Sequence, residues 1–172
     1  MKLIPDAYYK DIYEIDYNKL KKKGFKYIIF DVDNTLIPYT EDKVRRENKF
    51  LITKLKKMGL VPIIMSNSRS KRVNKIIDEL KIEGYVFSMK PLKKNYNKII
   101  KKYNKDKCMF IGDQLMTDVK GAKRCGFKVI LVDRINEKEP FTTKFWRKIE
   151  SRKIKKYKKK KEFIIGEYYN NI

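Results

Sequence analysis

Histidine is absent from all 172 residues. Its absence excludes Ser-His-Asp triads, histidine-ligated zinc sites and histidine general bases. The two cysteines, Cys108 and Cys125, lack the close spacing of a metal knuckle or a redox pair, so we interpret both as small apolar residues in a reducing compartment. No apolar run approaches the ~20 residues that span a bilayer, and the first residues contain no signal-peptide core. We therefore expect a soluble, cytoplasmic protein.

Acidic residues are few relative to basic ones. The chain has 44 Lys and Arg against 21 Asp and Glu, a formal charge of +23. Such a charge favours anionic partners: nucleic acid, anionic lipid or a phosphorylated substrate. Lys, Ile, Asn and Tyr are abundant along the whole chain, however, as an AT-rich genome would produce. Both explanations of the charge stay open.

Short apolar runs alternate with helical stripes from residue 27 onward. Turn-forming residues bound the runs, which predicts buried strands at 27–30, 60–65, 85–87, 108–111 and 127–132. The apolar stripes that predict helices are Val44, Leu51, Leu55, Met58; Val73, Ile76, Ile77, Leu80; Leu92, Tyr96, Ile99, Ile100, Tyr103; and Leu115, Val119, Ala122. Gly59, Gly84 and Gly126 fall at helix-to-strand junctions, where a left-handed cap is expected. The pattern predicts an α/β fold: a doubly wound sheet of about five parallel strands.

The chain reads as a single domain over residues 1–172. Its core is expected at about 24–135, with an N-terminal arm at 1–23 and a basic C-terminal helix at 142–161. Residues 143–161 carry eleven Lys and Arg against one acid, Glu150. Apolar residues cover about half of that helix: Trp146, Ile149, Ile154 and Tyr157. Such a helix either covers the core or lies on a membrane surface, and 143–161 is therefore a candidate for peripheral membrane contact.

Polar side chains follow the ends of four predicted strands. They are Asp31 and Asp33, Ser66 and Asn67, Lys90, and Asp113 with Asp118. Each signal alone is as easily a turn, a helix cap or a surface residue. Because the carboxyl ends of parallel strands meet at the edge where ligands bind, their joint placement predicts one site.

These residue types match the requirements of phosphoryl transfer. Asp31 and Asp113 can supply oxygen ligands for Mg²⁺, the expected cofactor. Lys90, the Ser66 hydroxyl and the backbone N–H of Asn67 can hold phosphate oxygens. Asp31 would attack the phosphorus to form an aspartyl-phosphate. Asp33 would protonate the leaving oxygen and later deprotonate the hydrolytic water.

The motifs resemble those of the haloacid dehalogenase-like (HAD) phosphatases. The first motif stands here as Asp31-Val32-Asp33-Asn34-Thr35, and Ser66, Lys90 and Gly112-Asp113-x₄-Asp118 follow in the family's order. The resemblance implies a HAD-like Rossmannoid fold with Asp31 as nucleophile and Asp33 as acid/base. It also implies a metal held by Asp31, the main-chain carbonyl of Asp33 and Asp113, with Asp118 in support.

Nearly the whole chain is similar to the YqeG-like branch of HAD subclass IIIA, which includes mitochondrial phosphatidylglycerophosphate phosphatases. The matching segments are 3–6, 33–36, 66–67, 90–91, 112–119 and 141–145, and the Lys-rich stretch 153–161 departs from the branch. The resemblance implies dephosphorylation of phosphatidylglycerophosphate, an anionic phospholipid, to phosphatidylglycerol. The intervals 40–60 and 81–90 are too short for a cap domain, which predicts an open site suited to a large or membrane-bound phosphate.

Other functions remain to be weighed. A phosphatase acting on nucleic-acid ends, phosphoproteins or small phosphate esters would also suit the charge and the open site. A receiver domain would place its Lys after the last acidic motif, whereas Lys90 precedes Asp113. A basic nucleic-acid-binding protein with a vestigial site is a non-enzymatic alternative, but no recognised binding motif supports it. Seven unclustered glycines exclude a P-loop kinase. The sequence leaves the oligomeric state open.

Overall fold

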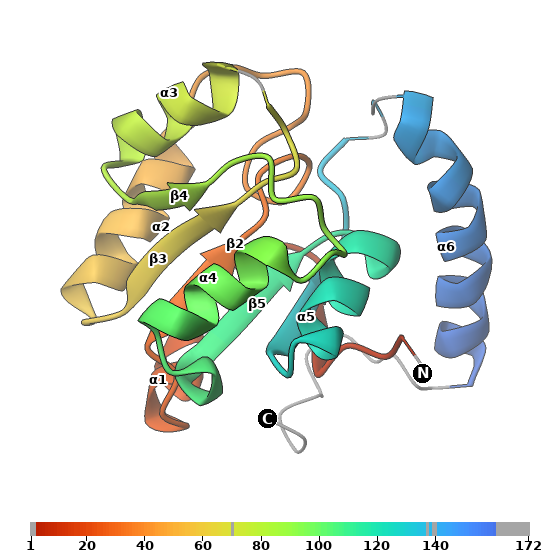
Figure 1. The fold of residues 1–172 in the computed structure, drawn as a ribbon, viewed down its shortest axis with the longest axis horizontal. Coiled ribbons are helices and arrows are strands. Elements are labelled where there is room, and N and C mark those ends of the chain that lie inside the picture. Colours follow the sequence, from red (N-terminus) through yellow and green to blue (C-terminus); the bar gives the residue numbers. More distant parts are fainter. Residues whose placement is uncertain (1–2, 70, 137, 139–140, 161–172) are drawn as a thin grey trace.

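One parallel sheet organises the chain. The computed structural model describes residues 3–69, 71–136, 138 and 141–160, and only the backbone of 141–146. Six strands pair in the order β1-β6-β5-β2-β3-β4, all parallel (Figure 1). They are β1 (Ala7–Tyr9), β2 (Tyr27–Phe30), β3 (Val61–Met65), β4 (Glu83–Tyr85), β5 (Cys108–Gly112) and β6 (Lys128–Val132). The predicted doubly wound α/β fold is confirmed.

Helices cover both faces of the sheet. Strand residues alternate between the two layers: Ile28 and Phe30 pack into one core cluster and Ile29 into the other. The first cluster contains residues of α1 (Tyr17–Lys22), α2 (Arg46–Lys57) and α3 (Lys71–Leu80). The second is covered by α4 (Lys94–Lys102), the π-helical turn η2 (Leu115–Val119), α5 (Lys120–Arg124) and α6 (Phe141–Lys159). Figure 1 shows α4 and α5 on the near side of the sheet and α6 beside α5.

The sixth strand lies in the segment that the sequence suggested to be an arm. β1 pairs with β6, with Ala7 opposite Ile130, and all three of its residues are buried. Asp16 then begins α1, since its carboxylate accepts the N–H of Lys19 at 3.0 Å. A strand of three residues without alternation gives no periodic signal, which explains why it was missed. The segment 1–23 therefore contributes an edge strand to the core.

Two helices begin later than their apolar stripes suggested. α2 starts at Arg46, so Val44 lies in the preceding loop, where it is still buried. α4 starts at Lys94, and Leu92 lies before it with half of its surface exposed. Leu92 is therefore not a core residue.

Two of the three glycines that were predicted to end helices in a left-handed conformation do so, and the third does not. Gly59 and Gly126 adopt φ of 79° and 78°, the left-handed conformation expected after a helix. Gly84 instead lies inside β4, which covers Glu83–Tyr85 rather than 85–87. A Cβ atom at Gly84 would lie 2.2 Å from Cδ1 of Ile77 on α3. Close packing of helix on strand, rather than a cap, requires this glycine.

The loops that follow β2 and β4 contain no inserted domain. Residues 31–45 and 86–93 are described throughout and form only connections, apart from an isolated bridge between Asp33 and Ile37. The strand ends are thus uncapped, as predicted. In the described part of the chain, none of the helices combines the length and hydropathy that crossing a membrane would require.

Candidate active site

Three buried charges meet where β2 and β5 end. Lys90 Nζ donates to Asp31 Oδ1 at 2.5 Å and to Asp118 Oδ1 at 2.7 Å. Asp31 directly follows β2, and its backbone N–H donates to Ile111 of β5 at 2.9 Å, which fixes it between the two central strands. The three charged residues are at most 6% exposed. One buried lysine shared by two ionised carboxylates offsets one of their two negative charges, so the group keeps an excess of negative charge that a cation can neutralise.

Asp113 completes a cluster of carboxylates that fits a divalent cation. One oxygen each from Asp31, Asp113 and Asp118 lies within 4.8 Å of the others. The Thr35 hydroxyl lies 3.2 Å from Asp113 Oδ1 and 3.4 Å from Asp31 Oδ2, and so links two of the three. Closely spaced, buried carboxylate oxygens are the donor set that Mg²⁺ and similar hard cations prefer.

Burial raises the pKa of two carboxyl groups in this cluster. It raises the pKa of Asp31 to about 6, although Lys90 opposes the shift. Burial likewise raises the pKa of Asp113 to about 8, opposed by Arg147. Burial alone would lower the pKa of Lys90, but the Asp118 and Asp31 carboxylates raise it above its usual value. Lys90 therefore stays positively charged, whereas Asp113 binds a proton readily unless a cation replaces it.

The Asp33 side chain is separate from that cluster. Its carboxylate forms an ion pair with Arg72 of α3, and Arg72 also donates to the carbonyl of Glu41 at 2.7 Å. The Asp33 side chain is 23% exposed, so water and substrate can reach it. The expectation that its main-chain carbonyl binds metal stays a prediction.

Ser66 and Asn67 follow β3, and Asn67 contacts the backbone of Lys90. The buried Ser66 hydroxyl accepts the N–H of Ser68 at 3.1 Å. The side chain of Asn67 forms two hydrogen bonds with the backbone of Lys90. Its Nδ2 donates to the Lys90 carbonyl at 3.1 Å, and its Oδ1 accepts the Lys90 N–H at 2.7 Å. Asn67 thus positions Lys90, while binding of phosphate by Ser66 and Asn67 stays a prediction.

A π-helical turn brings Asp118 to the site, where the sequence suggested a continuous α-helix. The N–H of Val119 bonds to the Gln114 carbonyl at 3.1 Å, and Asp118 Oδ2 accepts the Gln114 N–H at 3.0 Å. Such turns are frequent at functional sites. Gly112 makes room for Asp118, because a Cβ there would lie 2.5 Å from the Asp118 Cγ.

The substitution Gly112→Ala should therefore disable the site without unfolding the sheet. The added methyl must displace the Asp118 carboxylate, and Lys90 then loses one of its two partners. We expect the catalytic activity of the site to fall roughly tenfold or more, as misplacement of a charged group by about 1 Å commonly does. The control is Gly24→Ala, which strains the backbone at a φ of 91° away from the site and brings no atom within 4 Å of the added Cβ; equal activity loss in both variants would contradict this role of Gly112.

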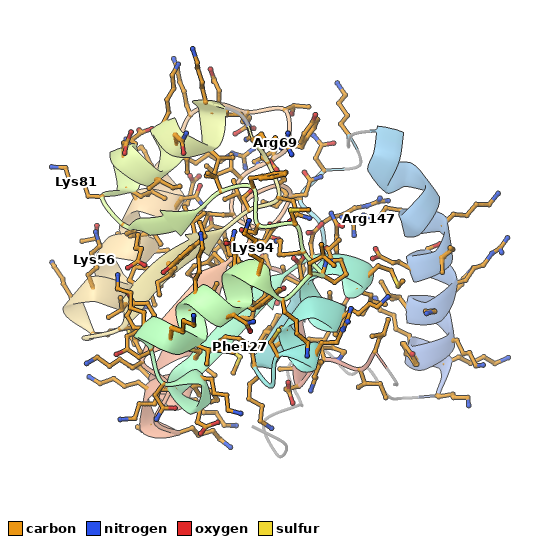
Figure 2. The ribbon with its side chains drawn as sticks, in the orientation of Figure 1. Lys56, Arg69, Lys81, Lys94, Phe127 and Arg147 are labelled. Atoms are coloured by element: carbon orange, nitrogen blue, oxygen red, sulfur yellow. The ribbon has the colours of Figure 1, made fainter. Side chains whose placement is uncertain are left out.

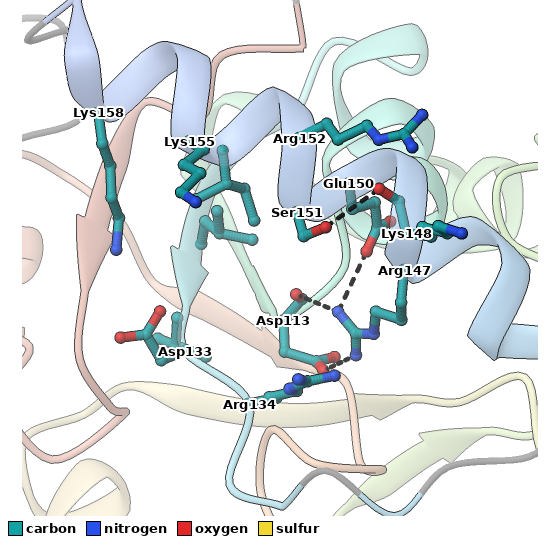
Figure 3. A pocket seen from close by; sticks show the side chains of 13 residues that line it. Asp113, Asp133, Arg134, Arg147, Lys148, Glu150, Ser151, Arg152, Lys155 and Lys158 are labelled. Carbon is teal, nitrogen blue, oxygen red and sulfur yellow. Dashed lines mark hydrogen bonds and ion pairs between the residues drawn. The ribbon is translucent and has the colours of Figure 1, made fainter.

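The basic C-terminal helix contributes directly to the site. Arg147 of α6 forms an ion pair with the Asp113 carboxylate and donates to the Asp113 carbonyl at 2.9 Å (Figure 3). It also donates to Glu150 Oε2 at 3.1 Å, and Glu150 Oε1 accepts the Met116 N–H at 2.7 Å. Sequence reasoning missed Arg147. The available signal was Glu150, the single acid of this basic segment, which is only 1% exposed.

The same helix packs on the core through its apolar residues. Ile154 and Tyr157 are partly buried against the second core cluster. The Trp146 side chain, which the sequence placed on the same apolar half, lies outside the described residues. Two of the four residues of its predicted apolar half therefore pack against the core.

Arg147→Gln should raise the pH at which the site binds a divalent cation. The guanidinium lowers the proton affinity of Asp113, so its removal makes protons stronger competitors of the cation. The measurement is calorimetric titration with Mg²⁺ between pH 6 and pH 9. Lys156→Gln on the exposed side of the same helix changes the charge equally and should leave the pH dependence unchanged. Coincident profiles for both variants and wild type would exclude coupling between α6 and Asp113.

A pocket of about 690 Å³ opens between α6 and the end of β6, with Asp113 in its wall. Its lining carries more cations than acids; the cations are Arg134, Arg147, Lys148, Arg152, Lys155 and Lys158, and the acids Asp113, Asp133 and Glu150. Figure 3 shows Arg134 next to Asp113 and Lys158 pointing toward Asp133. The pocket adjoins the carboxylate cluster and has the charge to receive an anion.

The fold, the uncapped strand ends and the cluster of acids with Lys90 define a hydrolase of the haloacid dehalogenase type. The family model for haloacid dehalogenase-like hydrolases matches residues 40–126, and the chain belongs to this family. It is 33% identical over 159 residues to the Bacillus subtilis protein named "Probable phosphatase YqeG", covering 91% of this chain and 92% of that protein. The chain is a HAD-type phosphatase.

Solved structures share the fold. The cobalt-bound deoxy-D-mannose-octulosonate 8-phosphate phosphatase of Haemophilus influenzae aligns with a TM-score of 0.55 and 18% identity, covering 74% of this chain and 77% of that one. A HAD-like family hydrolase from Porphyromonas gingivalis aligns with a TM-score of 0.55 and 14% identity over 72% of this chain and 98% of its own. At these identities the likeness concerns the fold.

Proposed function

We propose that this phosphatase is Mg²⁺-dependent, that it acts through an aspartyl-phosphate on Asp31, and that phosphatidylglycerophosphate is its substrate. The observation that carries the chemical part is the convergence of Asp31, Lys90 and the two further carboxylates at one edge of the sheet. Scattered side chains could not serve one phosphate and one cation together. Here a single lysine contacts two of the three acids.

The residues divide the reaction into two displacements. An Asp31 carboxylate oxygen attacks phosphorus, and the bond from phosphorus to the leaving oxygen breaks as Asp33 protonates that oxygen. Water then attacks the phosphorus of the aspartyl-phosphate while Asp33 takes its proton, which releases inorganic phosphate and restores Asp31. The exposure of Asp33 suits it to exchange protons with both a leaving alcohol and water.

Charge neutralisation supports the first displacement. A carboxylate nucleophile and a phosphate dianion repel each other, and Lys90 offsets part of this repulsion from its place against Asp31. A Mg²⁺ ion held by Asp31, Asp113 and Asp118 would supply the remaining positive charge. Ser66 and the backbone N–H of Asn67 would hold equatorial phosphate oxygens.

Three features favour a lipid phosphate over a small metabolite. The strand ends carry no cap domain, so nothing in the loops 31–45 and 86–93 encloses the substrate. The basic pocket beside Asp113 suits the second anionic group that phosphatidylglycerophosphate carries next to its phosphomonoester. The chain also resembles the branch that contains enzymes for this lipid. A phosphate at a nucleic-acid end would also suit the basic pocket, but the resemblance to this branch does not favour it.

The test is phosphate release from phosphatidylglycerophosphate vesicles, from a 5′-phosphorylated oligonucleotide, from a phosphopeptide and from p-nitrophenyl phosphate. We expect kcat/KM to be highest for the lipid and EDTA to abolish turnover of all of them. Turnover of the oligonucleotide, the phosphopeptide or the small ester without the lipid would disprove the substrate but leave the phosphatase chemistry intact.

A further inference from the structure

Exposed apolar side chains gather on the loops that surround the catalytic residues. Among the described residues, seven large apolar or aromatic side chains are exposed. Five of them follow strand ends and form what we name the apolar rim: Tyr39, Phe87, Met89, Leu92 and Ile135, each 37–50% exposed. The other two, Tyr13 and Phe50, line a separate pocket beside α2. Exposed apolar groups that cluster in this way mark interaction sites.

The backbone ties the rim to the catalytic centre on both sides. Asn34, which follows Asp33, accepts the N–H of Tyr39 on its side chain at 3.0 Å and that of Ile135 on its carbonyl at 2.9 Å. Met89 directly precedes Lys90, and its carbonyl accepts the Leu92 N–H at 2.8 Å.

The remaining member of the rim is tied in the same way. The Phe87 N–H donates to the Ser68 carbonyl at 3.0 Å, two residues after Ser66. Every rim residue therefore either adjoins a proposed catalytic residue in the sequence or is hydrogen-bonded to a close sequence neighbour of one.

The charges beside Phe87, Met89 and Leu92 indicate the kind of partner that the rim binds. The loops 66–70 and 86–93 contain no acid, and the Arg69 guanidinium lies 3.4 Å from the ring centroid of Phe87. Exposed Lys93 and Lys94 follow Leu92. In Figure 2, Arg69 lies at the end of the molecule where these loops gather, away from Lys56 and Lys81. Apolar side chains next to cations suit an anionic bilayer, where the former insert among acyl chains and the latter meet head groups.

We infer that the apolar rim docks the catalytic edge of the protein on an anionic membrane. The inference rests on the proposed lipid substrate for the nature of the partner, and it moves the membrane contact from helix 143–161 to the strand-end loops. Docking here would present the open site to head groups. Two described apolar residues of α6, Ile154 and Tyr157, pack against the core instead.

The test is flotation of the full chain with phosphatidylglycerol vesicles and with phosphatidylcholine vesicles. We expect binding to the anionic vesicles only, and binding at least about tenfold weaker in the variant Phe87→Asn/Leu92→Gln. Asn tolerates the positive φ of 49° at Phe87. The matched control is Phe50→Gln on α2, which removes the most exposed aromatic of the described residues, at 73%, and should bind as wild type does. Hydrolysis of p-nitrophenyl phosphate should be equal in all three proteins.

The outcomes of these experiments distinguish failure of the docking surface from failure of the proposed substrate. Rim-dependent binding without hydrolysis of phosphatidylglycerophosphate would support the docking surface and disprove the substrate. Equal vesicle binding by wild type and the rim variant would overturn the docking surface even if the lipid were hydrolysed. Loss of binding in Lys156→Gln/Lys159→Gln, with the rim variant unaffected, would overturn it in favour of the basic helix. A rim variant impaired only on a phosphoprotein would overturn the choice of a bilayer.

Discussion

Asp31→Asn is expected to lower kcat by at least about a thousandfold, because it removes the attacking oxygen while preserving the shape of the side chain. The amide can still accept a hydrogen bond from Lys90, whose second partner, Asp118, is untouched. The fold should therefore survive, with a thermal unfolding midpoint close to that of the wild type. The measurement is steady-state phosphate release, accompanied by circular dichroism of the same samples.

Asp78→Asn is the matched control for that variant. It makes the same chemical change at an exposed position of α3 and should leave kcat unchanged. Retention of wild-type turnover by Asp31→Asn would exclude Asp31 as the nucleophile. A large fall in both variants would indicate that amide substitution disturbs the protein in general.

Divalent-cation binding is expected to strengthen steeply with pH. Burial raises the pKa of Asp31 to about 6 and that of Asp113 to about 8, so below these values protons occupy oxygens that the cation needs. Between pH 6 and 8 one proton must leave Asp113, which predicts roughly a tenfold gain in Mg²⁺ affinity per pH unit. Above pH 8 the gain should level off. Calorimetric titration across this range measures the slope.

Two amide variants separate the cation site from the acid/base. Asp113→Asn removes one of three carboxylates and the group that titrates near pH 8, so it should weaken Mg²⁺ binding strongly and flatten its pH dependence. Asp33→Asn should bind Mg²⁺ with the affinity and the pH dependence of the wild type, because the Asp33 carboxylate pairs with Arg72 outside the cluster. An unchanged affinity in Asp113→Asn would place the cation elsewhere.

Much of this site was predictable because its chemistry is local in the sequence. Asp31 and Asp113 each follow a strand whose apolar run is unmistakable, and parallel strands bring their carboxyl ends together. Lys90 follows β4, whose predicted bounds were displaced by two residues. The strand β1 was not predictable, since three buried residues carry no period.

The partners of the carboxylates escaped prediction for a different reason. Arg72 and Arg147 lie on helices and reach Asp33 and Asp113 across the fold. In a chain with 44 Lys and Arg, no spacing distinguishes these two arginines from the basic residues that face solvent. Only the buried Glu150, alone among cations in its segment, carried a signal of tertiary contact.

The central claim is that phosphate passes through a covalent bond to Asp31, and trapping that bond tests it most directly. Asp33→Asn should transfer a phosphoryl group to the enzyme but hydrolyse it slowly, because the group that activates water is gone. Acid quenching of this variant after mixing with substrate and Mg²⁺, followed by peptide mass spectrometry, should find one phosphoryl group on Asp31. Phosphate on another residue, or rapid turnover without any phosphoenzyme, would contradict the account.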